Sequence, residues 1–255
     1  MILAIDVGNT NTVLGCIEGG EIKHIVRIKT CIGDTFEEYA IKLKQLFDFY
    51  GIEQGGFEGA IMSSVVPPVN RPISDAVKSL TGCELMIVDH RTPTGIGINI
   101  DDPGTLAGDL LVGGAAASHF YGAPAIIIDM GTATTVTVVD KDNDFRGGVI
   151  MPGIRLSLAA LASGTSLLPQ ISISRPEHSI GSNTVDCMRS GAVYGTAATV
   201  DGLIDRMENE LGYKCTLVAT GGLASAVIPQ CTHKDIICDD DLLLKGLDYI
   251  YHLNK

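Results

Sequence analysis

The sequence predicts an α/β fold in which one structural unit occurs twice. An internal repeat is the first observation: residues 3–13 match residues 126–136 at one constant offset, which aligns Asp6 with Asp129 and Gly8 with Gly131. The second observation is that each copy of this hairpin leads into a third strand and then into alternating helices and strands. A three-stranded meander followed by α/β alternation, present twice, is the pattern of a duplicated ribonuclease-H-like unit.

The individual elements follow from hydrophobic periodicity and turn residues. Both hairpins consist of an apolar strand, a polar turn of the form Asp-x-Gly-Asn/Thr and a second strand. In the first half we expect further strands at 21–28, 59–63 and 84–88, and helices at 35–50 and 67–80. In the second half we expect strands at 145–150, 216–219 and 236–237, and helices at 106–121, 154–162, 184–211 and from 240 onward, with one short helix after residue 222. The predicted domains are residues 1–103 and residues 104–255, and the second includes a dimerisation helix.

The charge of the chain limits its function. Its 255 residues carry a formal net charge of −12 and no basic run, which is atypical of a protein that neutralises nucleic-acid phosphates. We therefore expect no nucleic-acid partner, and any phosphate site must be built locally from backbone amides and a metal ion. No apolar run reaches the length of a membrane span, and seven cysteines without a Cys-x-x-Cys pair are typical of reduced thiols. These features predict a cytoplasmic protein that does not enter a membrane.

The two hairpin turns have the composition of a polyphosphate site. Glycine lets backbone amides approach a phosphate closely, and hydroxyl groups add donors without adding charge. The hydroxyls in question belong to Thr10, Thr12, Thr132, Thr134 and Thr135. The carboxylates of Asp6 and Asp129 suit a cation such as Mg²⁺, which prefers oxygen ligands. The pair therefore predicts a nucleotide cleft between two domains; the alternative is two ordinary turns in which each Asp caps its own backbone.

Several motifs occur in a fixed order along the chain, and together they resemble those of the type III pantothenate kinases. They are Asp6–Thr10, Asp129–Thr135, Gly147–Gly153, Ala160–Leu161 with Thr165, Leu168–Pro169, Ile180–Thr184 and Thr220–Gly222. The resemblance covers essentially the whole chain and implies the actin-like ATPase fold of sugar kinases and Hsp70. It also implies ATP-dependent phosphorylation of the primary hydroxyl of pantothenate to 4'-phosphopantothenate, the first step of coenzyme A synthesis. The family is homodimeric and uses Mg²⁺ and a monovalent cation, K⁺ or NH4⁺.

The resemblance also implies residue roles. Asp109 is expected to be the general base, and Asp129 to bind the monovalent cation. Asp6 is expected to bind Mg²⁺, directly or through water. The expected ATP-binding residues are Asp6, Val7, Gly8, Asn9, Thr10, Asn11, Thr12, Val13 and Thr132. The expected substrate-binding residues are Ala107, Gly108, Asp109, Leu110 and Thr184, the last acting across the dimer.

The sequence departs from the family pattern near the acceptor. The usual Gly-x-Asp-Arg occurs here as Ala107-Gly108-Asp109-Leu110, and a Tyr commonly found upstream falls at Ile100. Both missing groups are expected around the pantothenate carboxylate, which needs a cationic or donor-rich partner. Two alternatives therefore stay open: a kinase for another small hydroxyl metabolite, and a non-catalytic regulatory relative, since members of the superfamily have been linked to transcriptional accessory roles.

Overall fold

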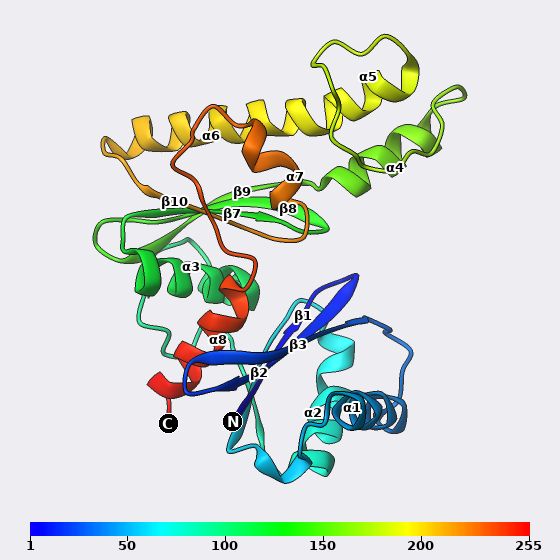
Figure 1. Cartoon of the computed structure of the whole chain (residues 1–255). Helices are drawn as coiled ribbons and strands as arrows, with labels where there is room; N and C mark the ends of the chain where they lie inside the picture. The colour runs from blue at the N-terminus through cyan, green and yellow to red at the C-terminus, as the bar shows by residue number, and fades with distance from the viewer. The chain divides into compact units, whose positions relative to one another are not determined.

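The computed structural model describes all 255 residues, which form two compact units (Figure 1). The first unit comprises residues 1–116 and 242–255, and the second comprises residues 117–241. This division differs from the one expected at residues 103/104. The boundary falls within helix α3 (Gly108–Tyr121), and the last helix, α8 (Leu242–Leu253), belongs to the first unit. The physical reason is that apolar residues of both helices pack on the first sheet, among them Leu111, Val112, Leu244 and Leu247.

The first unit is built on a five-stranded sheet of order β3-β2-β1-β4-β5. Its strands are β1 (Ile2–Val7), β2 (Asn11–Glu18), β3 (Glu21–Lys29), β4 (Gly59–Ser64) and β5 (Leu85–Ile87). The first three pair antiparallel as the predicted meander, whereas β4 and β5 are parallel to β1. The short strand β6 (Gly97–Ile98) follows them in the chain. The carboxyl ends of β1 and β4 therefore lie at the same edge of the sheet.

Helices cover both faces of the first sheet because β1 is apolar on both sides. Leu3, Ile5 and Val7 pack in the core beneath α1 (Phe36–Tyr50) and α2 (Pro67–Thr81), which lie side by side. Ile2 and Ala4 alternate with them and face the core formed with α3 and α8. Helix α1 begins at Phe36, one residue after the predicted start, because Thr35 and Glu38 form a capping box in which Thr35 is the N-cap.

The second unit repeats the plan. Its strands are β7 (Ala125–Met130), β8 (Ala133–Val139), β9 (Asp144–Pro152), β10 (Thr216–Thr220) and β11 (Ile237–Cys238). They are ordered β11-β10-β7-β8-β9, with β7, β8 and β9 antiparallel and β10 and β11 parallel to β7. One face packs against α4 (Ile154–Gly164), α6 (Thr196–Leu211) and α7 (Ala224–Val227). None of the helices in the structure combines the length and apolar character needed to cross a membrane.

The helix predicted at 184–211 consists of three segments. Asn183 caps α5 (Thr184–Ser190) by accepting a hydrogen bond from the amide of Asp186. A π-helical turn, η3 (Gly191–Gly195), then joins α5 to α6, and the three segments form one long rod (Figure 1). The rod therefore has a local change of winding in its middle.

Candidate functional site

The first hairpin tip is the turn between β1 and β2. The Gly8 amide donates to the Asn11 carbonyl at 3.0 Å, which closes the turn, while the side chains of Asn9, Thr10 and Asn11 are exposed. On the adjacent strand, the Val65 amide donates to the Val7 carbonyl at 3.0 Å. The tip thus projects polar groups and backbone from the carboxyl end of β1.

Thr12 differs from its neighbours because its hydroxyl is directed inward. Its side chain is buried, and its Oγ1 lies 2.9 Å from Oγ1 of Thr30. Thr30 follows β3, is itself buried, and donates its hydroxyl proton to the Gly8 carbonyl at 2.7 Å. Sequence reasoning assigned Thr12 to the phosphate site and missed Thr30. The available signal was a threonine two residues beyond Ile28, which pairs with Thr12 in the β2–β3 register.

The second hairpin tip consists of Gly131 and Thr132, both exposed, between β7 and β8. Here the residue after the third strand closes the tip through its backbone: the Gly153 amide donates to the Thr132 carbonyl at 3.1 Å. A Cβ on Gly153 would lie only 2.4 Å from that carbonyl oxygen, so a side chain at this position would displace the tip. A Cβ on Gly131, by contrast, would make only ordinary contacts of 3.5 Å or more. Nothing inside the chain requires residue 131 to be glycine.

Asp129 lies beside the turn at Thr220–Gly222, as the shared edge of β7 and β10 predicts. Asp129 pairs with Thr220 in the parallel register, and a Cβ on Gly221 would lie 2.5 Å from Oδ1 of Asp129. Gly221 also has a φ of +92°, which favours glycine. Within the second unit, Asp129, the candidate cation ligand, therefore lies against Gly221 of the Gly-Gly turn. The second glycine of the turn, Gly222, has open space beside it.

Asp109 lies at the same edge of the first sheet as the first tip. It occupies the first turn of α3, and the preceding residue, Gly108, packs against the ends of the neighbouring strands. A Cβ on Gly108 would lie 2.9 Å from the Val88 carbonyl and 3.4 Å from Oγ of Ser63. Ser63 pairs with Asp6 in the β1–β4 register, and paired residues face the same side of a sheet. The structure therefore brings Asp6, the first tip and Asp109 together within one unit.

The electrostatics of Asp109 differ from those expected for an exposed helix start. Burial raises the pKa of its carboxyl group above the ordinary value, although hydrogen bonds from the amides of Leu110 and of Asp109 itself oppose this rise. The Leu110 amide donates to Oδ1 at 2.7 Å. A partly desolvated carboxylate is a stronger proton acceptor than a solvated one.

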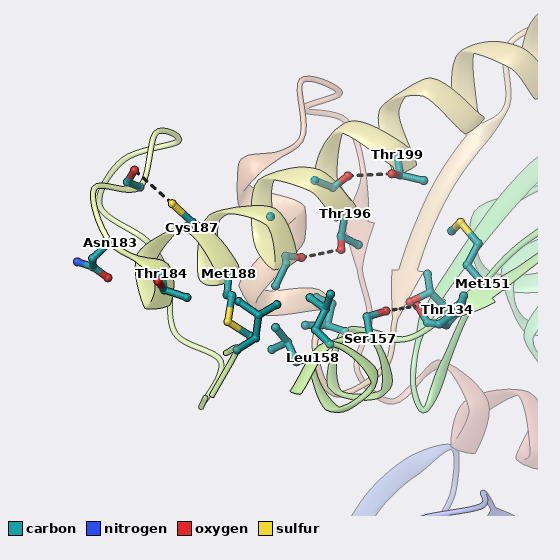
Figure 2. Close-up of a pocket in the computed structure, with 18 of the residues that line it drawn as sticks. Thr134, Met151, Ser157, Leu158, Asn183, Thr184, Cys187, Met188, Thr196 and Thr199 are labelled. Atoms are coloured by element: carbon teal, nitrogen blue, oxygen red, sulfur yellow. Dashed lines mark hydrogen bonds between the residues drawn. The ribbon is translucent and has the colours of Figure 1, made fainter. Parts of the chain in front are cut away.

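Thr184 lies in the second unit at one end of an apolar groove of about 920 Å³ (Figure 2). Thr134 and Met151, next to the second tip, lie at the other end, and Leu158 and Met188 lie between the ends. The groove is bounded by α4 on one side and by α5, η3 and α6 on the other. Thr184 is thus not in the same unit as Ala107, Gly108, Asp109 and Leu110.

The resemblance leads us to expect an arginine at the position of Leu110, and three other arginines of the chain are candidates to replace it. Arg155 and Arg175 are exposed. Arg189 is half-buried on α5, where its Nη1 lies 3.7 Å from Oδ1 of Asp186 in the same helix. Ile100 is half-buried.

Comparison with known proteins identifies the family. The family model described as type III pantothenate kinase matches residues 2–206. The chain belongs to this family. The type III pantothenate kinase of Geobacillus sp. (strain WCH70) is 40% identical over 254 residues, which cover 100% of this chain and 98% of that protein.

Solved structures of more distant proteins show the same fold. A Campylobacter jejuni protein described as a Baf family transcriptional activator aligns over 99% of this chain and 98% of its own, with a TM-score of 0.59 and 17% identity. The inorganic polyphosphate/ATP-glucomannokinase of Arthrobacter sp. strain KM aligns over 100% and 99%, with a TM-score of 0.53 and 13% identity. The chain therefore has the predicted fold, in which a ribonuclease-H-like unit occurs twice.

Proposed function

We propose that the protein transfers the γ-phosphoryl group of ATP to the primary hydroxyl of pantothenate, forming 4'-phosphopantothenate as the first step of coenzyme A synthesis. One observation carries this proposal beyond family membership. The partly buried carboxyl group of Asp109 lies at the same sheet edge as Asp6 and the Gly8–Asn11 tip. A candidate base thus belongs to the same unit as a candidate phosphate-binding turn.

The ATP phosphates bind at the turns in this proposal. Residues 6–13 supply the backbone amides and polar side chains of the first tip, and Thr132 contacts ATP from the second. Gly131 supports the assignment, because the fold leaves ordinary space for a side chain there and yet the residue is glycine. Close approach of a ligand to the backbone explains that choice.

The carboxylates at the two strand ends suit hard cations. Asp6 would hold Mg²⁺, directly or through water, and Asp129 would hold K⁺ or NH4⁺. Both are half-buried carboxylates whose partners in strand register, Ser63 and Thr220, carry hydroxyl groups. The donor set is entirely oxygen, which fits these ions. When bound, the divalent ion neutralises phosphate charge, which matters in a chain of net charge −12.

Asp109 acts as the general base. It accepts the proton of the acceptor hydroxyl while that oxygen forms its bond to the γ-phosphorus and the bond to the ADP oxygen breaks. The raised pKa of its carboxyl group brings the base closer to neutrality and so favours the proton transfer. Residues 107–110 orient the acceptor beside this carboxylate.

The expected acceptor site departs from the family pattern at two positions, Leu110 and Ile100. The side chains of Leu110 and Ile100 cannot bind a carboxylate. This observation favours a second candidate function, phosphorylation of another small alcohol that lacks the pantothenate carboxylate.

We also propose that the enzyme is a cytoplasmic homodimer in which Thr184 contributes to the acceptor site of the partner subunit. Its seven cysteines are all free thiols, as in proteins of reducing compartments. The second unit, which contains the groove of Figure 2, also exposes large apolar side chains. They are Ile150, Leu156, Leu161, Leu167 and Ile180, with Leu167 90% and Ile180 86% exposed. An apolar surface of this kind is typical of an interface.

Coupled measurement of ADP release tests the activity. We expect ATP consumption that depends on pantothenate and on a divalent cation, with 4'-phosphopantothenate identified by mass spectrometry. Consumption that depends instead on another small alcohol would establish the second candidate. No consumption with any acceptor would identify a non-catalytic relative.

A further inference from the structure

Thr30 is a buried polar residue that the mechanism above does not use. Its hydroxyl donates to the Gly8 carbonyl at 2.7 Å, and its amide donates to the Thr10 carbonyl at 3.1 Å. Both acceptors belong to the first tip, although they lie 22 and 20 residues from Thr30 in the sequence. Thr30 therefore joins the tip to the end of β3 at two points.

The direction of the hydrogen bonds follows from counting protons. A threonine hydroxyl has one proton, and Thr30 gives its proton to the Gly8 carbonyl, which can only accept. In the 2.9 Å contact between the two hydroxyls, Thr12 must then be the donor. The order is Thr12 to Thr30 to Gly8, and the Thr12 proton is not available to a phosphate.

The segment that carries Thr30 is itself fixed to the core. The Tyr39 hydroxyl donates a hydrogen bond to the carbonyl of the next residue, Cys31, at 3.1 Å. Tyr39 belongs to α1, and its side chain is buried in the core. Thr30 is thus an anchored support rather than a mobile loop residue. A buried hydroxyl in such a place holds the tip in one geometry only while both of its bonds are made.

The second tip is closed by a backbone hydrogen bond of the same kind. There, Gly153 follows the corresponding third strand and its backbone lies directly on the tip carbonyls of Gly131 and Thr132. In the first copy the corresponding bond runs from the Thr30 amide to the Thr10 carbonyl, and the Thr30 hydroxyl adds a second bond, to the Gly8 carbonyl. The first tip is therefore held by a side-chain hydrogen bond in addition to the backbone bond that both copies have.

We infer that Thr30 is a positioning residue for ATP, which holds the Gly8–Asn11 tip in its phosphate-binding geometry through the bonded series Thr12–Thr30–Gly8. The inference rests on the proposed function of the first tip. Thr30 does not touch the nucleotide; it acts through the Gly8 carbonyl and the tip backbone.

Three substitutions test the support itself. Thr30→Val keeps the shape and removes the donor, so we expect the ATP affinity measured by calorimetry to fall about tenfold, or about 1.4 kcal/mol. KM for the acceptor should change less than about twofold, and amide hydrogen exchange of residues 8–12 should accelerate. Thr30→Ser restores the hydroxyl and should restore affinity. Thr12→Val should have the same effect in weaker form, and the double variant should be no worse than Thr30→Val alone.

Thr81→Val is the matched control. The Thr81 hydroxyl also donates to a carbonyl, that of Val77 at 2.8 Å, and also accepts a bond, from the Cys83 amide at 3.1 Å. It lies at the end of α2, at the opposite edge of the sheet from the tip. This variant should lose stability without losing ATP affinity. If Thr30→Val does not fold, Thr12→Val compared with Thr81→Val decides the question.

A variant of the exposed tip separates failure of this inference from failure of the proposed site. Asn9→Glu places a negative charge at the tip, and the expected loss of ATP affinity is at least about tenfold through repulsion of phosphate. If Asn9→Glu binds ATP normally, the proposed phosphate site is wrong and the inference falls with it. If Asn9→Glu loses ATP but Thr30→Val retains normal affinity or normal exchange at residues 8–12, only the role of Thr30 is overturned.

Discussion

The carboxyl group of Asp109 combines two properties that usually oppose each other, since it is partly buried and yet is proposed to ionise at neutral pH. Burial raises the pKa of the group, so its ionised form is less stable in the folded protein than in the unfolded chain. A group with a raised pKa stabilises the fold below its unfolded value, and this contribution is lost as the pH rises through the folded value. At neutral pH, Asp109 therefore weakens the fold.

Asp109→Asn should separate the two properties. We expect turnover to fall by about 10²–10⁴-fold because the base is gone, while calorimetry shows ATP affinity close to that of the wild type. The melting temperature at pH 7 should rise, because the neutral amide does not need to ionise in a buried place. In the wild type, the acidic limb of the kcat profile should lie above the pH expected for a solvated carboxyl group.

Asp102→Asn is a suitable control for this comparison. Asp102 is exposed, lies near Asp109 in the chain and caps the short 3-10 turn Pro103–Thr105 by accepting from the Gly104 amide. Its substitution should leave the pH profile unchanged. A turnover for Asp109→Asn above a tenth of the wild-type rate would contradict the assignment of the base.

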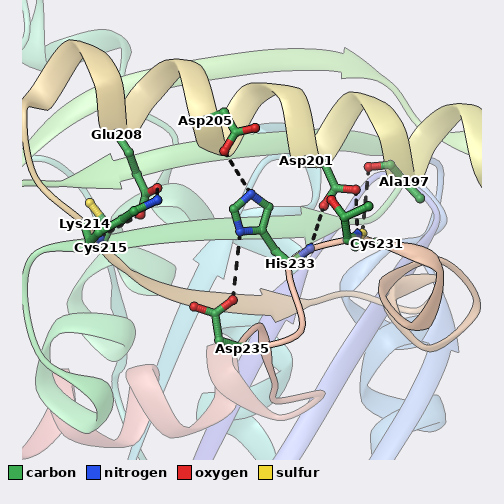
Figure 3. Close-up of polar contacts among 10 residues, drawn as sticks. Ala197, Asp201, Asp205, Glu208, Lys214, Cys215, Cys231, His233 and Asp235 are labelled. Carbon is green, nitrogen blue, oxygen red and sulfur yellow. Dashed lines mark hydrogen bonds and ion pairs between the residues drawn. The ribbon is translucent and has the colours of Figure 1, made fainter.

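At the scale of elements, α6 is attached to two loops by acidic side chains (Figure 3). Asp201 accepts hydrogen bonds from the amides of Thr232 at 2.7 Å and His233 at 3.2 Å, and the His233 ring lies 3.1 Å from Asp205. One helical turn further, Glu208 accepts from the Cys215 amide at 3.0 Å and from Lys214. The helix thus fixes both the segment that enters β10 and the segment that follows α7.

Asp201→Asn should reveal the strength of this attachment. Burial alone would raise the pKa of Asp201, but the amides of Thr232 and His233 outweigh it and hold the pKa below its usual range. The amide side chain cannot accept both bonds equally, so the free energy of unfolding should fall by about 1–3 kcal/mol at pH 7. A group with a lowered pKa stabilises the fold above its unfolded value. The difference between wild type and variant should therefore be complete at neutral pH and shrink as the pH falls below about 4.

Denaturant titrations at several pH values measure this difference. Asp235→Asn provides the control, since that carboxylate is 75% exposed and lies 4.0 Å from Nδ1 of His233. Exposed pairs of this kind contribute little. An equal loss of unfolding free energy in the two variants would show that the attachment depends on the His233 ring. The hydrogen bonds that Asp201 accepts from two backbone amides would then not be decisive.

The sequence predicted the individual helices and strands better than the contacts between elements that are distant in the chain. Local signals fixed the hairpins, the capped start of α1 and the alternation of helices and strands, because these depend on neighbouring residues. The π-helical turn at Gly191–Gly195 has no such signal and was predicted as ordinary helix. Thr30 was missed for a related reason: its bonds to Thr12 and Gly8 join residues from different strands. An apolar face on α8 predicts that it packs, but not on which of two sheets.

At the scale of the whole molecule, the proposed dimer requires that one acceptor site contain residues of two chains. Mixing inactive variants tests this requirement. Asp109→Asn and Thr184→Val subunits should each have low activity, and after subunit exchange a fraction of sites should regain both intact residues. Activity should then recover in part, with sedimentation showing a dimer throughout.

The mixture needs a reference in which recovery is impossible. Asp109→Asn mixed with the double variant Asp109→Asn/Thr184→Val provides it, because no subunit then carries an intact base. A fully active monomer, or no recovery after mass spectrometry has verified the exchange, would place Thr184 outside the partner's site.

The position of α8 has a consequence for the order in which the chain acquires structure. The apolar surface formed by Ile2, Ala4 and Leu111 on the first sheet and α3 is covered by Leu244, Leu247 and Ile250. Those residues follow the whole second unit in the chain, so during synthesis one face of the first sheet stays uncovered until the second unit has been made. No single cut in the gene can separate the two units as independent proteins.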